Sequence, residues 1–89
     1  MNTDAKFIRL IEDCKRKVHE HPTDEEDQKR FDYIVEELTQ IKDAAINKTL
    51  ATDFEYLELT QMIERYDPEE IIDQVLAVNK FYVEHYQDL

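Results

Sequence analysis

The four residues Asp67-Pro68-Glu69-Glu70 carry the strongest helix-start signal in the chain. An aspartate accepts hydrogen bonds from free N–H groups, a proline at the first helical position sacrifices no bond, and first-turn glutamates suit the helix dipole. The pattern predicts a helix over about 68–87, with Asp67 as its N-cap. Its apolar side chains form an arc wide enough to contact two or three neighbouring helices: Ile71, Ile72, Val75, Leu76, Tyr82, Val83 and Tyr86.

The residues immediately before this signal predict another helix. Thr52-Asp53-Phe54-Glu55 repeats the capping pattern, so a helix is expected over about 53–66. Almost no linker separates it from the helix at 68–87, which predicts a sharp corner between the two. The apolar face of this helix is expected to contain Tyr56, Leu59, Met62, Ile63 and Tyr66. Phe54 and Leu57 lie off that face, where they would either pack under the loop 48–52 or contact a partner.

Two further helices are predicted in the first half of the chain. A helix over about 3–20 ends at His21-Pro22, because the residue before a proline avoids helical geometry. Thr23-Asp24-Glu25-Glu26 reads as a capping box with Thr23 as N-cap, and it starts a helix over about 24–47 whose first two turns should project into water. The expected core faces are Phe7, Leu10, Ile11, Cys14 and Val18 in the first helix, and Phe31, Ile34, Val35, Leu38, Ile41, Ala45 and Ile46 in the second.

The expected fold is therefore all-α: a compact bundle of four helices in one domain over residues 1–89. The alternative is a three-helix core with the first helix exchanged between two copies. The chain contains no glycine. This excludes the phosphate-binding P-loop, the dinucleotide-binding turn and the EF-hand loop, all of which need glycine backbone geometry.

The chain is strongly acidic, with 22 Asp and Glu against 11 Lys and Arg and a net charge of −11. Such a charge repels nucleic acids and anionic membranes, so neither is expected as a partner, and it favours a basic protein. The apolar residues of the N-terminus are interrupted by Asp4, Lys6 and Arg9, unlike a signal peptide. With Cys14 as the only cysteine, the sequence favours a cytoplasmic location.

Catalytic and metal-binding patterns are weak. His19-Glu20-His21 offers metal-binding side chains, but residues two apart on a helix do not face each other. The chain has no serine, and Cys14 lies at an apolar helical position. We therefore expect no metal, no cofactor and no enzymatic activity. Asn79, within the apolar arc of the last helix, is expected to be a structural amide.

The acidic charge is concentrated in the second half of the chain. Residues 1–48 have a net charge of −3 and residues 49–89 a net charge of −8. This concentration suggests either a solubilising surface or a binding face for a basic partner. Phe81 is expected on the outer side of the last helix, where it would anchor such a contact. The candidate partner-binding residues are Asp73, Glu84, Asp88, Phe81, Glu58 and Phe54.

The function expected from these patterns is a small acidic protein-binding module. It would act as an inhibitor that occludes a basic, nucleic-acid-handling protein through the helices at 53–66 and 68–87. The alternative is a self-associating structural or adaptor protein. In that case Phe54, Leu57 and Phe81 would form a homodimer interface.

Overall fold

The computed structural model describes residues 3–89 and contains three α-helices. These are α1 (Thr3–Glu20), α2 (Glu25–Ile46) and α3 (Glu69–His85), with a single 3-10 turn, η1 (Glu58–Gln61), before α3. No β-strand occurs among the described residues. The all-α expectation is confirmed, but the expectation of four helices is wrong: the helix predicted over 53–66 does not form.

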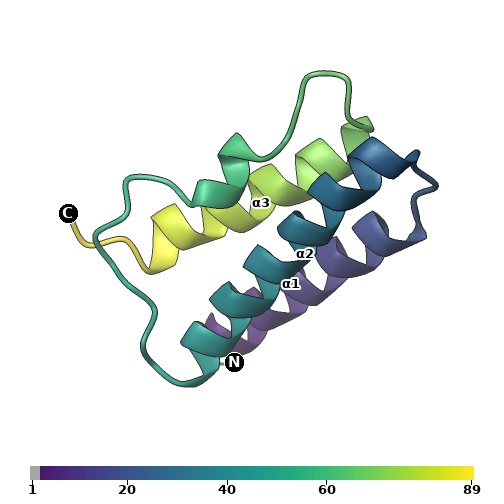
Figure 1. The fold of residues 1–89 in the computed structure, drawn as a ribbon. Coiled ribbons are helices and arrows are strands. Elements are labelled where there is room, and N and C mark those ends of the chain that lie inside the picture. The colour runs from purple at the N-terminus through teal and green to yellow at the C-terminus, as the bar shows by residue number, and fades with distance from the viewer. Residues whose placement is uncertain (1–2) are drawn as a thin grey trace.

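The α1 helix is the centre of the bundle. It packs against both α2 and α3, whereas the Cα atoms of α2 and α3 come nowhere within 8 Å of each other. Figure 1 shows the segment 47–68 leaving the end of α2 and returning along the bundle to the start of α3. On this path η1 contacts both α2 and α3. The irregular segment therefore takes the position that a fourth helix would have occupied.

The core contains most of the residues that the helical periodicity predicts. Ile46 (52% exposed), Leu76 (47%) and Val83 (37%) are exceptions, and all three lie at the edge of their helix's apolar face. Tyr56 and Tyr66, which were expected on the core face of the helix over 53–66, are also exposed because that helix does not form. The buried apolar residues are Phe7, Ile11, Cys14, Val18, Phe31, Ile34, Leu38, Ile41, Ala45, Leu57, Leu59, Ile71, Val75, Val78 and Tyr82.

The segment around Leu57 and Leu59 is irregular because tertiary contacts replace the hydrogen bonds of a helix. Both leucines are buried although they are two residues apart, which one face of a helix does not allow. Leu57 has an extended backbone, with φ −73° and ψ 139°. Its N–H donates to the Asn79 side-chain oxygen at 2.7 Å. Asn79 is thus a structural amide, and the segment fills the gap between α2 and α3 with two leucines.

Two of the predicted helix caps are wrong. The N-cap of α2 is Asp24, not Thr23, and its side chain accepts a 2.9 Å hydrogen bond from the Asp27 N–H. The N-cap position of α3 is Pro68, with no side-chain cap, because the Asp67 carboxylate is used elsewhere. The sequence signal located both helix starts within about two residues, which is the usual uncertainty of helix ends.

The C-terminus of α2 has the geometry of a glycine cap without a glycine. Lys48 adopts a left-handed conformation, with φ 60°. The Thr49 N–H donates to the Ala44 carbonyl at 2.8 Å and the Lys48 N–H to the Ala45 carbonyl at 3.3 Å, as in a Schellman motif. Lys48 also pairs with Asp4 in the first turn of α1. This ion pair joins the C-terminal end of α2 to the N-terminal end of α1.

Leu57 distinguishes the observed fold from the predicted four-helix bundle, in which its side chain would lie off the apolar face of the helix over 53–66. We expect Leu57→Ala to reduce the free energy of unfolding by about 2–5 kcal/mol, because it leaves a cavity between α2 and α3. The measurement is urea unfolding followed by circular dichroism. Leu76→Ala, at a half-exposed position of α3, should cost no more than about 1 kcal/mol. Equal effects of the two substitutions would contradict the buried position of Leu57.

Candidate functional site

Asp67 is the only buried charged residue among those the structure describes, and Arg30 is its partner. The Arg30 guanidinium donates from Nη1 to Oδ2 at 2.8 Å and from Nη2 to Oδ1 at 2.6 Å. Oδ2 also accepts from the Glu64 N–H at 2.7 Å, while Arg30 Nη1 reaches the Met62 carbonyl at 3.1 Å. This two-point pairing fastens the end of the irregular segment to α2. The expectation that Arg30 projects into water is therefore wrong.

The local charges determine how Asp67 ionises. Burial raises the pKa of the Asp67 carboxyl, but hydrogen bonds from Arg30 and the Glu64 N–H outweigh burial and hold that pKa below its usual value. The Arg30 guanidinium also lies 5.1 Å from the ring centroid of Phe31 and 5.7 Å from that of Tyr66. The pair has many partners within the chain, so we assign it to the architecture and not to binding.

We expect Asp67→Asn to lower the free energy of unfolding by about 3 kcal/mol at neutral pH, because it leaves Arg30 without its buried counter-charge. A carboxylate with a lowered native pKa stabilises the fold above its unfolded pKa and loses this effect as the pH falls through the native value. The difference between wild type and variant should therefore stay constant from neutral pH to about 5 and shrink below about 4.

The measurement is the urea midpoint across this pH range. Asp73→Asn, which removes the same charge from an exposed position on α3, should leave the midpoint nearly unchanged at neutral pH. A difference between wild type and Asp67→Asn that does not begin to shrink as the pH falls below about 4 would contradict an ion-pair origin.

The chain from Ala51 to Leu57 is held in place by polar side chains of α3 and of the residues after it. The Tyr82 hydroxyl donates to the Ala51 carbonyl at 2.7 Å and accepts from the Phe54 N–H at 3.3 Å. The Gln87 side-chain amide donates to the carbonyls of Phe54 and Glu55 at 2.9 and 2.8 Å. The backbone of this segment is therefore fixed although it contains no helix.

The fixed segment and α2 enclose a hollow of about 310 Å³. We call it the acidic–aromatic hollow because aromatic rings and carboxylates share its wall. Phe54 and Tyr56 are nearly half exposed there, at 47% and 46%, while Leu57 and Ile41 are buried. Tyr56 is oriented by a 2.7 Å hydrogen bond from the Gln61 side chain to its hydroxyl. The lining residues are Glu37, Ile41, Phe54, Tyr56, Leu57, Glu58 and Gln61.

Glu37 is held in an unfavourable electrostatic environment in this hollow. Its pKa is raised by burial first, and then by the negative charges of Glu58 and Glu36. Among the described residues, neither Glu37 nor Glu58 forms an ion pair. Three basic residues of α2 and its C-terminus pair elsewhere: Arg30 with Asp67, Lys42 with Glu12 and Lys48 with Asp4. The hollow thus has negative charge that its own protein does not neutralise.

The six candidate partner-binding residues do not form one surface. Phe54 and Glu58 line the acidic–aromatic hollow, and the Asp88 N–H donates to the Thr52 carbonyl at 2.6 Å, close to this segment. Asp73 and Glu84 lie about three turns apart on one side of α3, opposite the side that carries Tyr82 and faces Phe54. Glu84 also lies 3.9 Å from Lys80. The structure therefore separates an outer acidic face on α3 from the hollow.

Phe81 is not on the outer side of the molecule, as the helical periodicity had suggested. It is half-buried and stacks on Phe7 of α1, with the ring centroids 5.5 Å apart. The ring centroid of His85 lies 4.2 Å from that of Phe81. Since Leu57 is also buried, Phe54 is the only exposed member of the predicted homodimer seam. The prediction failed because α1 packs against a wider sector of α3 than the periodicity indicated.

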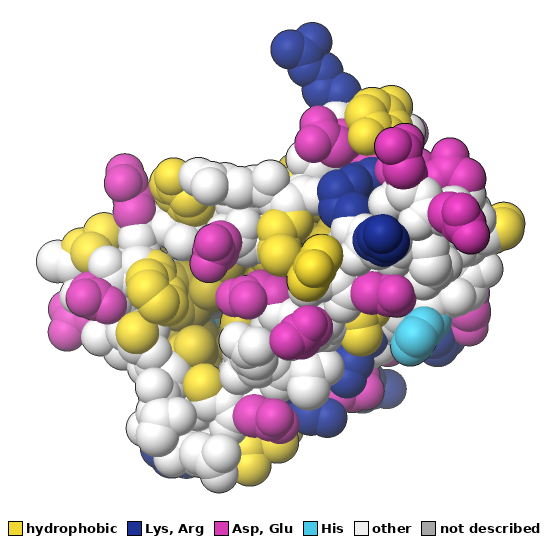
Figure 2. Space-filling model, viewed as in Figure 1, with side chains coloured by type: hydrophobic (Ala, Val, Ile, Leu, Met, Phe, Trp, Pro, Cys, Tyr) yellow, Lys and Arg dark blue, Asp and Glu magenta, His cyan; other side chains and the backbone are white. Residues whose placement is uncertain are grey.

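Figure 2 shows how charge and apolar surface are distributed on the face that carries the irregular segment. Acidic side chains are spread over the face, while apolar side chains gather on the side where residues 50–57 pass. The exposed apolar side chains of the irregular segment include Phe54, Tyr56 and Tyr66. On this face, exposed aromatic rings therefore lie among acidic side chains.

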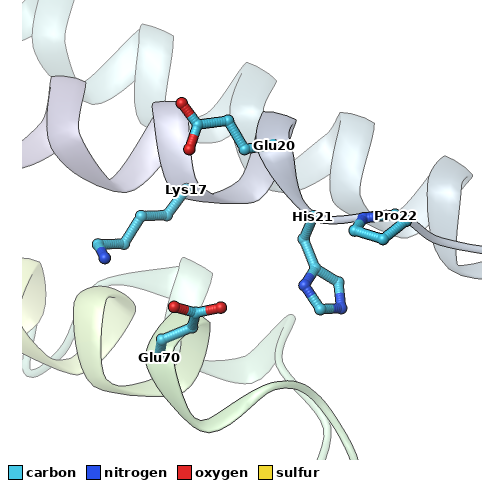
Figure 3. A pocket seen from close by; sticks show the side chains of 5 residues that line it. All are labelled: Lys17, Glu20, His21, Pro22 and Glu70. Carbon is cyan, nitrogen blue, oxygen red and sulfur yellow. The ribbon is translucent and has the colours of Figure 1, made fainter.

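A second hollow, of about 280 Å³, lies between the end of α1 and the start of α3. In Figure 3, Lys17 and His21 point toward α3 and Glu70 points back toward them, whereas Glu20 points away. Within residues 3–89, no group of three or more His, Cys, Asp or Glu side chains is placed to hold a metal ion. The hollow combines one lysine, Lys17, with the carboxylates of Glu20 and Glu70, so both signs of charge meet in it.

The sequence did not identify three residues of the acidic–aromatic hollow: Glu37, Tyr56 and Gln61. Glu37 follows the pattern of a solvent-exposed residue on α2, and Tyr56 was expected on the core face of a helix. Tyr56 is exposed because the helix that would have placed it in the core does not form. A weak signal for Glu37 was its position beside the apolar stripe that contains Ile34 and Leu38.

Comparisons with known proteins add no family to this description. No family model, no curated protein and no solved structure matches the chain. Among the described helices, none combines the length and apolar character needed to cross a membrane. Cys14 is buried, which raises the pKa of its thiol to about 12. Its thiol is therefore protonated at neutral pH and packs as an apolar side chain.

The charge of Glu37 should destabilise the fold at neutral pH. A carboxyl with a raised native pKa binds a proton more readily in the folded state, so its protonation stabilises the protein as the pH falls. We expect Glu37→Gln to raise the thermal midpoint at pH 8 in low salt, by a margin that decreases toward pH 5. Glu36→Gln, at an exposed position, should have a smaller effect. A lower midpoint for Glu37→Gln at pH 8 would contradict this account.

Proposed function

We propose that this chain is a small acidic protein-binding module that recognises a basic surface of another protein. The observation that carries the proposal is the acidic–aromatic hollow, where Glu37 and Glu58 have no ion pair among residues 3–89 while Phe54 and Tyr56 are exposed beside them. Residues that reduce the stability of the free protein are typical of functional sites, because the lost stability is recovered in the complex. A positively charged side chain would relieve the repulsion at Glu37.

The two acidic surfaces have different roles in this proposal. Exposed charges such as Asp73 and Glu84 accelerate the encounter with a basic partner through long-range attraction. Phe54 anchors the complex by burying its exposed ring area, with Asp88 and Glu58 at the border of the contact. Phe81, which packs against α1, acts only by supporting the structure.

The mechanism is occlusion. Carboxylates of the module occupy positions that phosphate groups would take on a nucleic-acid-handling protein, and so inhibit it by competition. The module needs no catalytic residues, metal or cofactor for this role. A cytoplasmic location, where Cys14 stays reduced, is part of the same proposal.

The test compares two double variants that remove the same amount of charge. Glu37→Gln/Glu58→Gln changes the hollow, and Asp73→Asn/Glu84→Gln changes the outer face of α3. Wild type and both variants are immobilised, and proteins from the source cells are captured and identified. The affinity of each variant for a captured basic protein is then measured at low and at high salt.

We expect the hollow variant to bind at least about tenfold more weakly, corresponding to about 1.4 kcal/mol, at both salt concentrations. The outer-face variant should mainly associate more slowly at low salt, and this deficit should disappear at high salt because long-range attraction is screened. Equal losses for the two variants would show that only net charge matters. Failure of the wild-type protein to retain any basic protein would refute the proposed function.

A further inference from the structure

The acidic–aromatic hollow has the chemistry of a receptor for one flat, positively charged group. Its volume of about 310 Å³ lies at the lower end of the range of about 300–1,000 Å³ found for small-molecule pockets, so it suits a side chain better than a cofactor. A metal ion is a poor occupant, because no group of three or more potential ligands occurs among residues 3–89. The commonest cations on protein surfaces are the ammonium of lysine and the guanidinium of arginine.

We infer that the hollow between α2 and the segment 54–61 binds an arginine side chain of the partner protein. This inference rests on the proposed function, and it specifies the side chain that the site recognises. A guanidinium is planar, stacks on aromatic rings and pairs with carboxylates through two parallel hydrogen bonds, whereas an ammonium is a compact and strongly hydrated point charge. Phe54 and Tyr56 provide ring surfaces, and Glu37 and Glu58 provide carboxylates.

The walls of the hollow are set before binding. Gln61 orients the Tyr56 ring through its hydroxyl, and Asn79 of α3 fixes the backbone between Tyr56 and Glu58 by accepting the Leu57 N–H. The Thr60 hydroxyl donates to the Leu57 carbonyl at 2.8 Å. A site with fixed walls loses less conformational entropy on binding, which favours a ligand of matching shape. The ring of Tyr56 is therefore the element expected to distinguish a planar cation from a spherical one.

The charge of the hollow is complementary to arginine and is not neutralised within the chain. Arg30 of α2 donates hydrogen bonds from Nη2 to the carboxylates of both Asp67 and Asp27. Lys42 turns toward α1, where it pairs with Glu12 at 2.7 Å. Arg30 and Lys42 therefore do not pair with Glu37 or Glu58, and a cation from outside meets two carboxylates in a half-apolar setting where charge pairs are stronger than in water.

The experiment uses a short arginine-containing peptide and the same peptide with every arginine replaced by lysine. Affinities for the wild-type protein are measured by calorimetry, and the site is located from backbone amide NMR shifts. We expect the arginine peptide to bind about tenfold more tightly, equivalent to about 1.4 kcal/mol. Its shifts should centre on Tyr56, Glu58 and Gln61.

Matched variants separate recognition of shape from recognition of charge. Tyr56→Leu should reduce the preference for arginine to about twofold or less, because leucine removes the stacking surface and keeps the apolar contact. Tyr66→Leu removes a tyrosine that is 70% exposed outside the hollow and should leave the preference intact. Glu37→Gln should weaken both peptides.

Equal affinity of the two peptides for the wild type would overturn the arginine inference and leave the proposed function standing, since a basic partner could still be bound by charge alone. Shifts centred on Asp73 and Glu84 would overturn it as well. The capture experiment decides the proposed function independently, because it asks whether any basic protein is retained at all.

Discussion

The buried pair of Asp67 and Arg30 is the interaction on which the arrangement of this small protein depends. It fixes the point at which the chain, after returning along the bundle, meets α2 again and turns into α3. As a helix N-cap, the Asp67 carboxylate would have accepted hydrogen bonds from nearby N–H groups of α3. This carboxylate instead binds a side chain 37 residues away, so a tertiary contact anchors the chain just before α3. Because both ions are largely removed from water, the loss of either one leaves an uncompensated charge.

This connection makes an open three-helix arrangement possible. α1 contacts both other helices, whereas within residues 3–89 no Cα atom of α2 comes within 8 Å of one of α3, and η1 of the irregular segment contacts both. A fourth helix would have satisfied its own backbone. Here Asn79, Tyr82 and Gln87 supply polar partners to the segment instead. The same side chains that complete the fold therefore also fix the walls of the acidic–aromatic hollow.

The uneven use of charge follows from this architecture. Basic residues of α2 and its C-terminus are used to hold the molecule together, as Arg30 with Asp67, Lys42 with Glu12 and Lys48 with Asp4. The chain has twice as many acids as bases, 22 against 11, so its internal pairing leaves carboxylates over. Glu37 is one of these excess carboxylates. Burial and the negative charges of Glu58 and Glu36 raise its pKa, which disfavours its ionised form. This unfavourable charge is what links the fold to the proposed recognition of a basic partner.

The sequence by itself determined the helical class and most of the core. It also determined the break at His21-Pro22 and the three long helices, to within about two residues at most ends. It could do so because 3.6-residue periodicity and helix capping are local properties. It also set the acidic character. Only the tertiary structure decided that residues 53–66 form no helix, that Phe81 packs inward, and that Glu37, Phe54, Tyr56 and Glu58 share one hollow. These outcomes depend on contacts between residues far apart in the chain, such as Leu57 with Asn79, and such contacts override local propensity without leaving a periodic trace in the sequence.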